Sequence, residues 1–122
     1  SGGVLSEQKP RESAPTRFTF DPRDPVPTIG GNVSSAGVLM FPGAFDQRCR
    51  PNLFTCRDQL PLAARRDVVV FQTPPLEADL EVTGSVEVNL FASTSAADTD
   101  FTAKLVDVHP PSAAFPNGVD LN

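Results

Sequence analysis

The sequence predicts an all-β domain, a β-sandwich, and three observations support this fold class. Thirteen prolines and eight glycines occur among 122 residues. This is too many for long helices, because proline removes a backbone donor and clashes with the preceding helical turn. Short runs of β-branched and aromatic residues, typical of strands, recur between these breakers. The longest patterned segment alternates apolar and polar side chains, as expected for a strand with one buried face.

The first third of the chain contains one expected strand between irregular segments. Residues 1–15 are polar and aperiodic, so we expect a lead-in linker, with the domain itself over residues 16–122. Residues 17–20 (RFTF) alternate polar and aromatic side chains and predict a short strand that ends at the proline-rich DPRDPVP. After the turn at Gly30-Gly31, residues 38–41 (VLMF) form a short apolar run.

The strongest strand patterns lie in the second half. Residues 68–71 (VVVF) form a continuous apolar run, which predicts a central strand covered on both faces. Residues 80–92 alternate apolar and polar side chains across Gly84, where we expect a bulge or a bend. Residues 101–108 (FTAKLVDV) predict another strand, and the terminal GVDLN predicts the start of one more. These five or six strands fall short of the about eight of a jelly roll, so we expect an incomplete sandwich.

Charge and hydropathy argue against several classes of partner. The formal net charge of −5 disfavours nucleic acid and anionic membranes, which attract basic surfaces. No apolar run approaches the roughly 20 residues that span a bilayer. The N-terminal residues lack the basic and apolar regions of a signal peptide, so the sequence leaves localisation undefined.

The two cysteines, Cys49 and Cys56, enclose six residues rich in loop formers, a spacing that allows a disulfide. In an oxidising compartment such a bridge adds roughly 2.5 kcal/mol through loop entropy. Two unpaired thiols in a surface loop are the alternative. One C-x6-C pair and a lone His109 fall short of four zinc ligands, so we expect neither a metal site nor a cofactor.

No catalytic triad is expected within the chain. The G-x-S-x-G pentapeptide of a nucleophile elbow does not occur, and Ser85 lies inside an alternating strand pattern. His109, the only histidine, lies at a proline-rich strand exit, and we interpret it as a surface or partly packed side chain.

The remaining charged residues have structural interpretations. We interpret the pairs Asp21/Asp24 and Asp98/Asp100 as turn formers rather than cation ligands. Asp107 and Lys104 interrupt an apolar strand, and we expect Asp107 to be partly buried with a cation or amide partner. Five arginines predict either a docking patch for an acidic neighbour or a solvated loop: Arg48, Arg50, Arg57, Arg65 and Arg66.

Several stretches, in this order and spacing, resemble the C-terminal domain of the X-prolyl dipeptidyl aminopeptidase and CocE/NonD (cocaine esterase and glutaryl acylase) family of serine hydrolases. They are SGG at 1–3, FTFDPRDPVPTIGG at 18–31, FDQR at 45–48 and the long stretch 64–110, which is most specific from Asp67 onward. The resemblance covers nearly the whole chain. The insertion with the two cysteines is longer than in shorter family members, and the chain stops where the family normally continues, which predicts a C-terminal truncation.

The resemblance implies a jelly-roll, galactose-binding-like β-sandwich packed on an α/β-hydrolase domain of the same parent chain. That domain supplies the catalytic Ser, Asp and His, so no residue here inherits a catalytic role. The parent would cleave an ester, an amide or an X-prolyl peptide. In related esterases the stretch after the matching glycines approaches the substrate, so Leu39, Met40 and Phe41 are expected at the active-site rim. The alternative is that these three side chains fill the sandwich core or the domain interface.

A free-standing carbohydrate- or ligand-binding module is the alternative function. Sugar-binding sandwiches usually present Trp or Tyr rings, which stack on sugar C–H faces. This chain contains neither residue. The composition therefore favours the accessory domain of a hydrolase.

Overall fold

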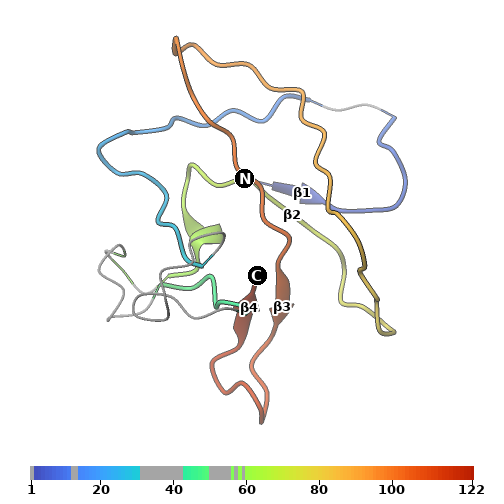
Figure 1. The fold of residues 1–122 in the computed structure, drawn as a ribbon. Coiled ribbons are helices and arrows are strands. Elements are labelled where there is room, and N and C mark those ends of the chain that lie inside the picture. The colour runs from blue at the N-terminus through green and yellow to red at the C-terminus, as the bar shows by residue number, and fades with distance from the viewer. Residues whose placement is uncertain (1, 12–13, 31–42, 50–55, 57, 59) are drawn as a thin grey trace.

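The computed structural model describes residues 2–11, 14–30, 43–49, 56, 58 and 60–122 (Figure 1). Along the chain these residues form β1 (Gly2–Val4), the 3-10 helix η1 (Leu62–Ala64), β2 (Val70–Gln72), β3 (Asp107–His109) and β4 (Val119–Leu121). No α-helix occurs in this described part. The domain is all-β, as the density of proline and glycine predicts.

The first sheet joins the N-terminus to the VVVF run. β1 and β2 pair in parallel, with Gly2 opposite Val70 and Val4 opposite Gln72. A Cβ atom at Gly2 would overlap the carbonyl oxygen of Val70, so glycine is required for this close approach. The lead-in over residues 1–15, predicted as a linker, is therefore not a loop throughout, because its glycines allow a strand at residues 2–4.

The second sheet brings together segments that are far apart in the sequence. β3 and β4 pair antiparallel, with Asp107 opposite Leu121 and His109 opposite Val119. Residues 45–48 run antiparallel to β4, since the amide N–H groups of Phe45 and Gln47 donate to the carbonyls of Asn122 (2.8 Å) and Asp120 (2.7 Å). Residues 47–49 in turn pair with residues 60–62. The strand start predicted at GVDLN is confirmed, and β4 lies between two partners.

The buried apolar cluster of the described residues lies beside this second sheet. It contains Ile29, Cys49 and Leu62, with Phe45 and Cys56 packed against it. These side chains come from four separate segments, so each segment is held by the others. Only a few apolar side chains are buried in this cluster, so hydrophobic burial here stabilises the fold only modestly. Polar contacts therefore also matter for holding the segments together.

Residues 73–106 form a long excursion without regular secondary structure between β2 and β3 (Figure 1). The strand predicted over residues 80–92 is wrong in this structure, and that predicted over 101–108 forms only at Asp107–His109. The alternating apolar side chains are between 55% and 66% exposed: Leu80, Val82, Val86, Val88 and Leu90. A period-two pattern predicts a strand only where a neighbouring strand accepts its hydrogen bonds, and the described residues provide none here.

Two further strand predictions also need correction. Residues 17–20 form no strand, and Phe18 and Phe20 are exposed. The VVVF run contributes β2, but Phe71 is 58% exposed, so this strand is not covered on both faces. The continuous apolar run correctly predicts a strand. Burial of that strand on both faces would require further layers packed against the sheet, and the described residues form none there.

We expect Gly2→Ala to lower the free energy of unfolding by about 1–3 kcal/mol, because the new methyl group forces β1 away from β2. Gly3→Ala is the matched control, since a Cβ there meets only the ring of Phe71, which can rotate away. Urea denaturation of both variants measures the difference. Equal losses at the two positions would contradict the close-approach argument.

Candidate functional site

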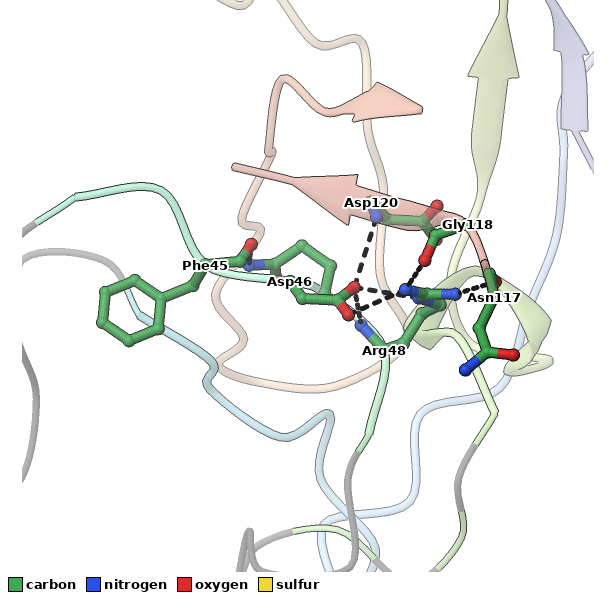
Figure 2. A network of polar contacts seen from close by, with 7 residues as sticks. Phe45, Asp46, Arg48, Asn117, Gly118 and Asp120 are labelled. Carbon is green, nitrogen blue, oxygen red and sulfur yellow. Dashed lines mark hydrogen bonds and ion pairs between the residues drawn. The ribbon is translucent and has the colours of Figure 1, made fainter. Parts of the chain in front are cut away.

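Among the described residues, a network of polar contacts centres on the Asp46–Arg48 pair, which lies in the FDQR stretch (Figure 2). Arg48 donates from Nη2 to Asp46 Oδ2 (2.9 Å) and from Nε to Asp46 Oδ1 (3.0 Å). The same Oδ1 accepts the backbone N–H of Asp120 at 3.2 Å. The Asp46 side chain is only 6% exposed, and these donors compensate for its removal from water.

Arg48 also holds the start of β4. Its guanidinium donates to the carbonyl oxygens of Asn117 and Gly118, about 70 residues further along the chain and directly before β4. Figure 2 shows the guanidinium between the Asp46 carboxylate and these two residues. The hydrogen bond to Asp46 raises the pKa of Arg48 above its usual value, which burial only partly offsets. The pair therefore fixes β4 against residues 45–48.

A second arginine, Arg65, ties the proline-rich segment to the end of η1. It donates to Asp67 through Nε and Nη2, both at 2.8 Å, and from Nη2 to the carbonyl oxygen of Asp24 at 2.6 Å. The hydrogen bond from Arg65 lowers the pKa of Asp67. Arg65 thus connects segments 41 residues apart.

The arginine patch predicted from the sequence is therefore wrong for two of its members. Arg48 and Arg65 are about one-fifth exposed and neutralised by carboxylates within the domain, so they cannot attract an acidic neighbour as free charges. Arg66 is exposed. Arg50 and Arg57 lie outside the described residues.

A third polar link was not anticipated. Lys104 donates to the side-chain oxygen of Gln47 (2.6 Å) and to the carbonyl of Ile29 (3.2 Å). Gln47 is 4% exposed and donates to the carbonyls of Ile29 and Phe45. Burial lowers the pKa of Lys104. The lysine that interrupts the apolar 101–108 pattern thus serves a buried amide rather than solvent.

Of the two cysteine alternatives, the structure has the disulfide. Cys49 and Cys56 are bonded with a Cα–Cα distance of 5.5 Å. Cys49 is 6% exposed and packs in the cluster with Ile29 and Leu62. The bridge fixes Cys49, the residue directly after Arg48, so the ion pair and the disulfide restrain adjacent residues.

His109 contacts Asp107 and Phe115 and no nucleophile among the described residues. Its Nε2 lies 2.9 Å from Asp107 Oδ2, and its ring centroid lies 5.2 Å from that of Phe115. The Asp107 side chain is 71% exposed, so the prediction that it is partly buried is wrong. The neighbouring apolar residues Leu105 and Val108 are themselves exposed and do not cover it. The surface interpretation of His109 agrees with this geometry.

The other residues that the sequence offers as site candidates either form turns or lie outside the described residues. Asp21 forms a turn, as expected, by accepting the N–H of Arg23 (2.9 Å). No cluster of three metal-ligating side chains and no helix able to cross a membrane occurs in the part of the chain that the structure describes. The rim residues Leu39, Met40 and Phe41 lie outside the described residues. The two hollows beside Arg65 measure about 100 and 230 Å³, below the roughly 300–1,000 Å³ of ligand pockets.

Three of the pairs between an acidic and a basic side chain share a spacing that sequence inspection missed. Asp46 with Arg48, Arg65 with Asp67, and Asp107 with His109 each stand two residues apart. In an extended chain, residues two apart point to the same side. An acidic and a basic residue at this spacing in a predicted strand is therefore a signal for a local ion pair.

Comparison with known families places the domain. The X-Pro dipeptidyl-peptidase C-terminal non-catalytic domain matches residues 5–118. The chain belongs to this family. It is also similar to the cocaine esterase of Rhodococcus sp. (strain MB1 Bresler), with 40% identity over 114 residues, which cover 93% of the chain and 17% of that esterase. No solved structure gives a significant match. The resemblance predicted from the sequence is confirmed, and the family is a β-sandwich.

We expect Arg48→Met to lower the free energy of unfolding by about 2–4 kcal/mol. The substitution leaves the Asp46 carboxylate without its guanidinium, but the partial exposure of Arg48 keeps the loss below that of full burial. Arg66→Met is the matched control, since Arg66 is exposed. Thermal or urea unfolding measures both, and similar losses would show that the Asp46–Arg48 pair contributes nothing special.

We expect the domain to lose stability on acidification partly through Asp67. The pKa of this carboxyl is lower in the folded state than its unfolded value of about 3.9. Its contribution is therefore present above about pH 4 and lost as the pH falls through the folded pKa. Asp67→Asn should flatten the acid limb of a stability–pH curve, whereas Asp79→Asn, at an exposed position, should not. Superimposable curves for wild type and Asp67→Asn would refute this assignment.

Proposed function

We propose that this chain is the accessory C-terminal domain of a serine acyl hydrolase, in which it stabilises the hydrolase domain and shapes the active-site rim. The observation that carries the proposal is 40% identity to a cocaine esterase over 93% of the chain. Membership of a family of non-catalytic C-terminal domains supports the accessory role. The parent enzyme would act on an ester, an amide or an X-prolyl peptide.

Catalysis in this proposal belongs to the hydrolase domain of the parent. A serine there would form the acyl-enzyme, aided by a histidine and an oxyanion hole. The only histidine here, His109, pairs with an exposed Asp107 on β3 and is not hydrogen-bonded to a described serine hydroxyl. This chain would therefore supply no proton transfer to the reaction.

The stabilising role is supported by the apolar side chains that the excursion leaves open. Five alternating residues over 80–90 are more than half exposed. Burying one such Val or Leu fully is worth about 1.5–3 kcal/mol, so covering this segment inside a larger sandwich would stabilise the assembled protein considerably. Such a continuous exposed apolar row is unusual for a free surface.

The rim role of Leu39, Met40 and Phe41 stays a prediction. It is supported by the neighbouring geometry, because Ile29 and Gly30 are buried against Phe45 and held by Lys104 and Gln47. This fixes the chain immediately before the segment that carries the three side chains. A rigid support under a binding segment is the usual arrangement in β-sandwiches.

A carbohydrate-binding module is the second candidate, and the structure offers little in its favour. The chain has no Trp or Tyr, and its described hollows are smaller than ordinary ligand pockets.

We expect the full-length protein, but not residues 1–122 alone, to hydrolyse p-nitrophenyl acetate or Gly-Pro-p-nitroanilide. His109→Ala in the full-length protein should leave kcat/KM within about twofold of wild type, since a factor of two is less than 0.5 kcal/mol of transition-state stabilisation. Release of p-nitrophenol or p-nitroaniline measures both. Turnover by residues 1–122 that disappears with His109→Ala would overturn the proposal, as would a full-length protein inactive on every ester, amide and X-prolyl substrate tested.

A further inference from the structure

The last two residues of the β3–β4 connection, directly before β4, are Asn117 and Gly118. Asparagine followed by glycine is the pair most prone to spontaneous deamidation, because glycine has no side chain to hinder attack by its own backbone nitrogen. Asn117 is exposed, and its side-chain amide points away from the guanidinium of Arg48 (Figure 2). Water and general bases can therefore reach this amide.

The backbone at the same place is held unusually firmly. The N–H of Gly118, the nitrogen that would attack, donates to the carbonyl of Phe115 at 2.8 Å. The carbonyls of Asn117 and Gly118 both accept from Arg48. Gly118 has a φ of +70°, and a Cβ there would lie 2.8 Å from the carbonyl oxygen of His109. The peptide unit thus has little freedom to rotate toward the Asn117 side chain.

We propose that Asn117 is a deamidation site whose reaction is held back by Arg48. The reaction requires the Gly118 nitrogen to lose its proton and bond to Cγ of Asn117. The side-chain nitrogen then leaves as ammonia, taking up the protons it needs from solvent, and a cyclic imide remains. Water opens the imide at either carbonyl and gives aspartate or isoaspartate. No oxidant or cofactor is needed, since the net change is addition of water and loss of ammonia.

The modification would act on the same contacts that restrain it. In isoaspartate the main chain runs through the former side-chain carbon Cγ to the nitrogen of Gly118, and the former main-chain carbonyl of Asn117, which accepts from Arg48, becomes a free carboxylate. This carboxylate competes with Asp46 for the guanidinium of Arg48. The inserted carbon atom also changes the spacing between the groups of residues 117 and 118 that Arg48 binds, so the product loosens β4 from residues 45–48.

The test compares deamidation rates by peptide mapping and mass spectrometry after incubation of the full-length protein in mildly alkaline buffer. Each rate is divided by that of a synthetic peptide of residues 114–121 at the same temperature. We expect wild type to react far more slowly than the peptide, and Arg48→Met to react about tenfold faster than wild type, which corresponds to about 1.4 kcal/mol at the barrier. Asn117→Gln should remove the signal and so verify the site.

Leu62→Ala is the matched control, because it weakens the buried cluster without removing a contact of Asn117 or Gly118. Each variant is incubated equally far below its own melting midpoint. We expect Leu62→Ala to stay near the wild-type ratio. A wild-type rate equal to that of the peptide, an unchanged rate in Arg48→Met, or equal acceleration in Leu62→Ala and Arg48→Met would each overturn the proposal, the last because global unfolding would then explain the protection.

Discussion

The bidentate contact between Asp46 and Arg48 is the interaction on which the rest of the second sheet depends. A carboxylate with only 6% exposure would destabilise the fold if it stood alone, so its position requires the guanidinium beside it. The guanidinium has further donors, which bind the carbonyls of Asn117 and Gly118 directly before β4. One ion pair therefore holds residues 45–48 and β4 in register, and backbone hydrogen bonds between them follow from that placement.

The domain relies on such links because its apolar cluster is small. Ile29, Cys49 and Leu62 form its buried part, while the alternating residues of 80–90 remain outside it. Arg65 and Lys104 repeat the principle that Arg48 illustrates, since each joins segments more than 40 residues apart through carbonyl or carboxylate oxygens. Polar links of this kind specify which segments meet, and the small apolar cluster adds the free energy of hydrophobic burial. In a β-sandwich, the exposed apolar side chains of residues 80–90 could pack against a second layer, which agrees with the family of this chain.

Sequence reasoning succeeded where the evidence is local. Proline and glycine excluded long helices, and the family resemblance rested on ordered motifs such as FDQR, which is confirmed by the family match over residues 5–118. It failed where the outcome depends on a neighbour. The pattern of residues 80–92 satisfies the side-chain rule for a strand, but a strand also needs a partner for its backbone. The pairing of β1 with β2 could not be predicted from side-chain patterns, because Gly2 has no side chain. Its role is to leave room for the carbonyl oxygen of Val70.

At the Asp46–Arg48 site, too, the sequence shows which residues are present but not which partners they contact. The sequence shows Arg48 and Arg65 only as charges, but their effect depends on acidic partners two residues away that face the same side. Once Arg48 is paired internally, it no longer offers a positive patch to another molecule, and its remaining donors act on the main chain of the hairpin. The FDQR stretch is then best understood as a structural connector, in which Asp46 positions Arg48 and Arg48 positions β4. A domain built around such a connector can keep residues 45–48 and β4 in a fixed arrangement even though its buried apolar cluster is small.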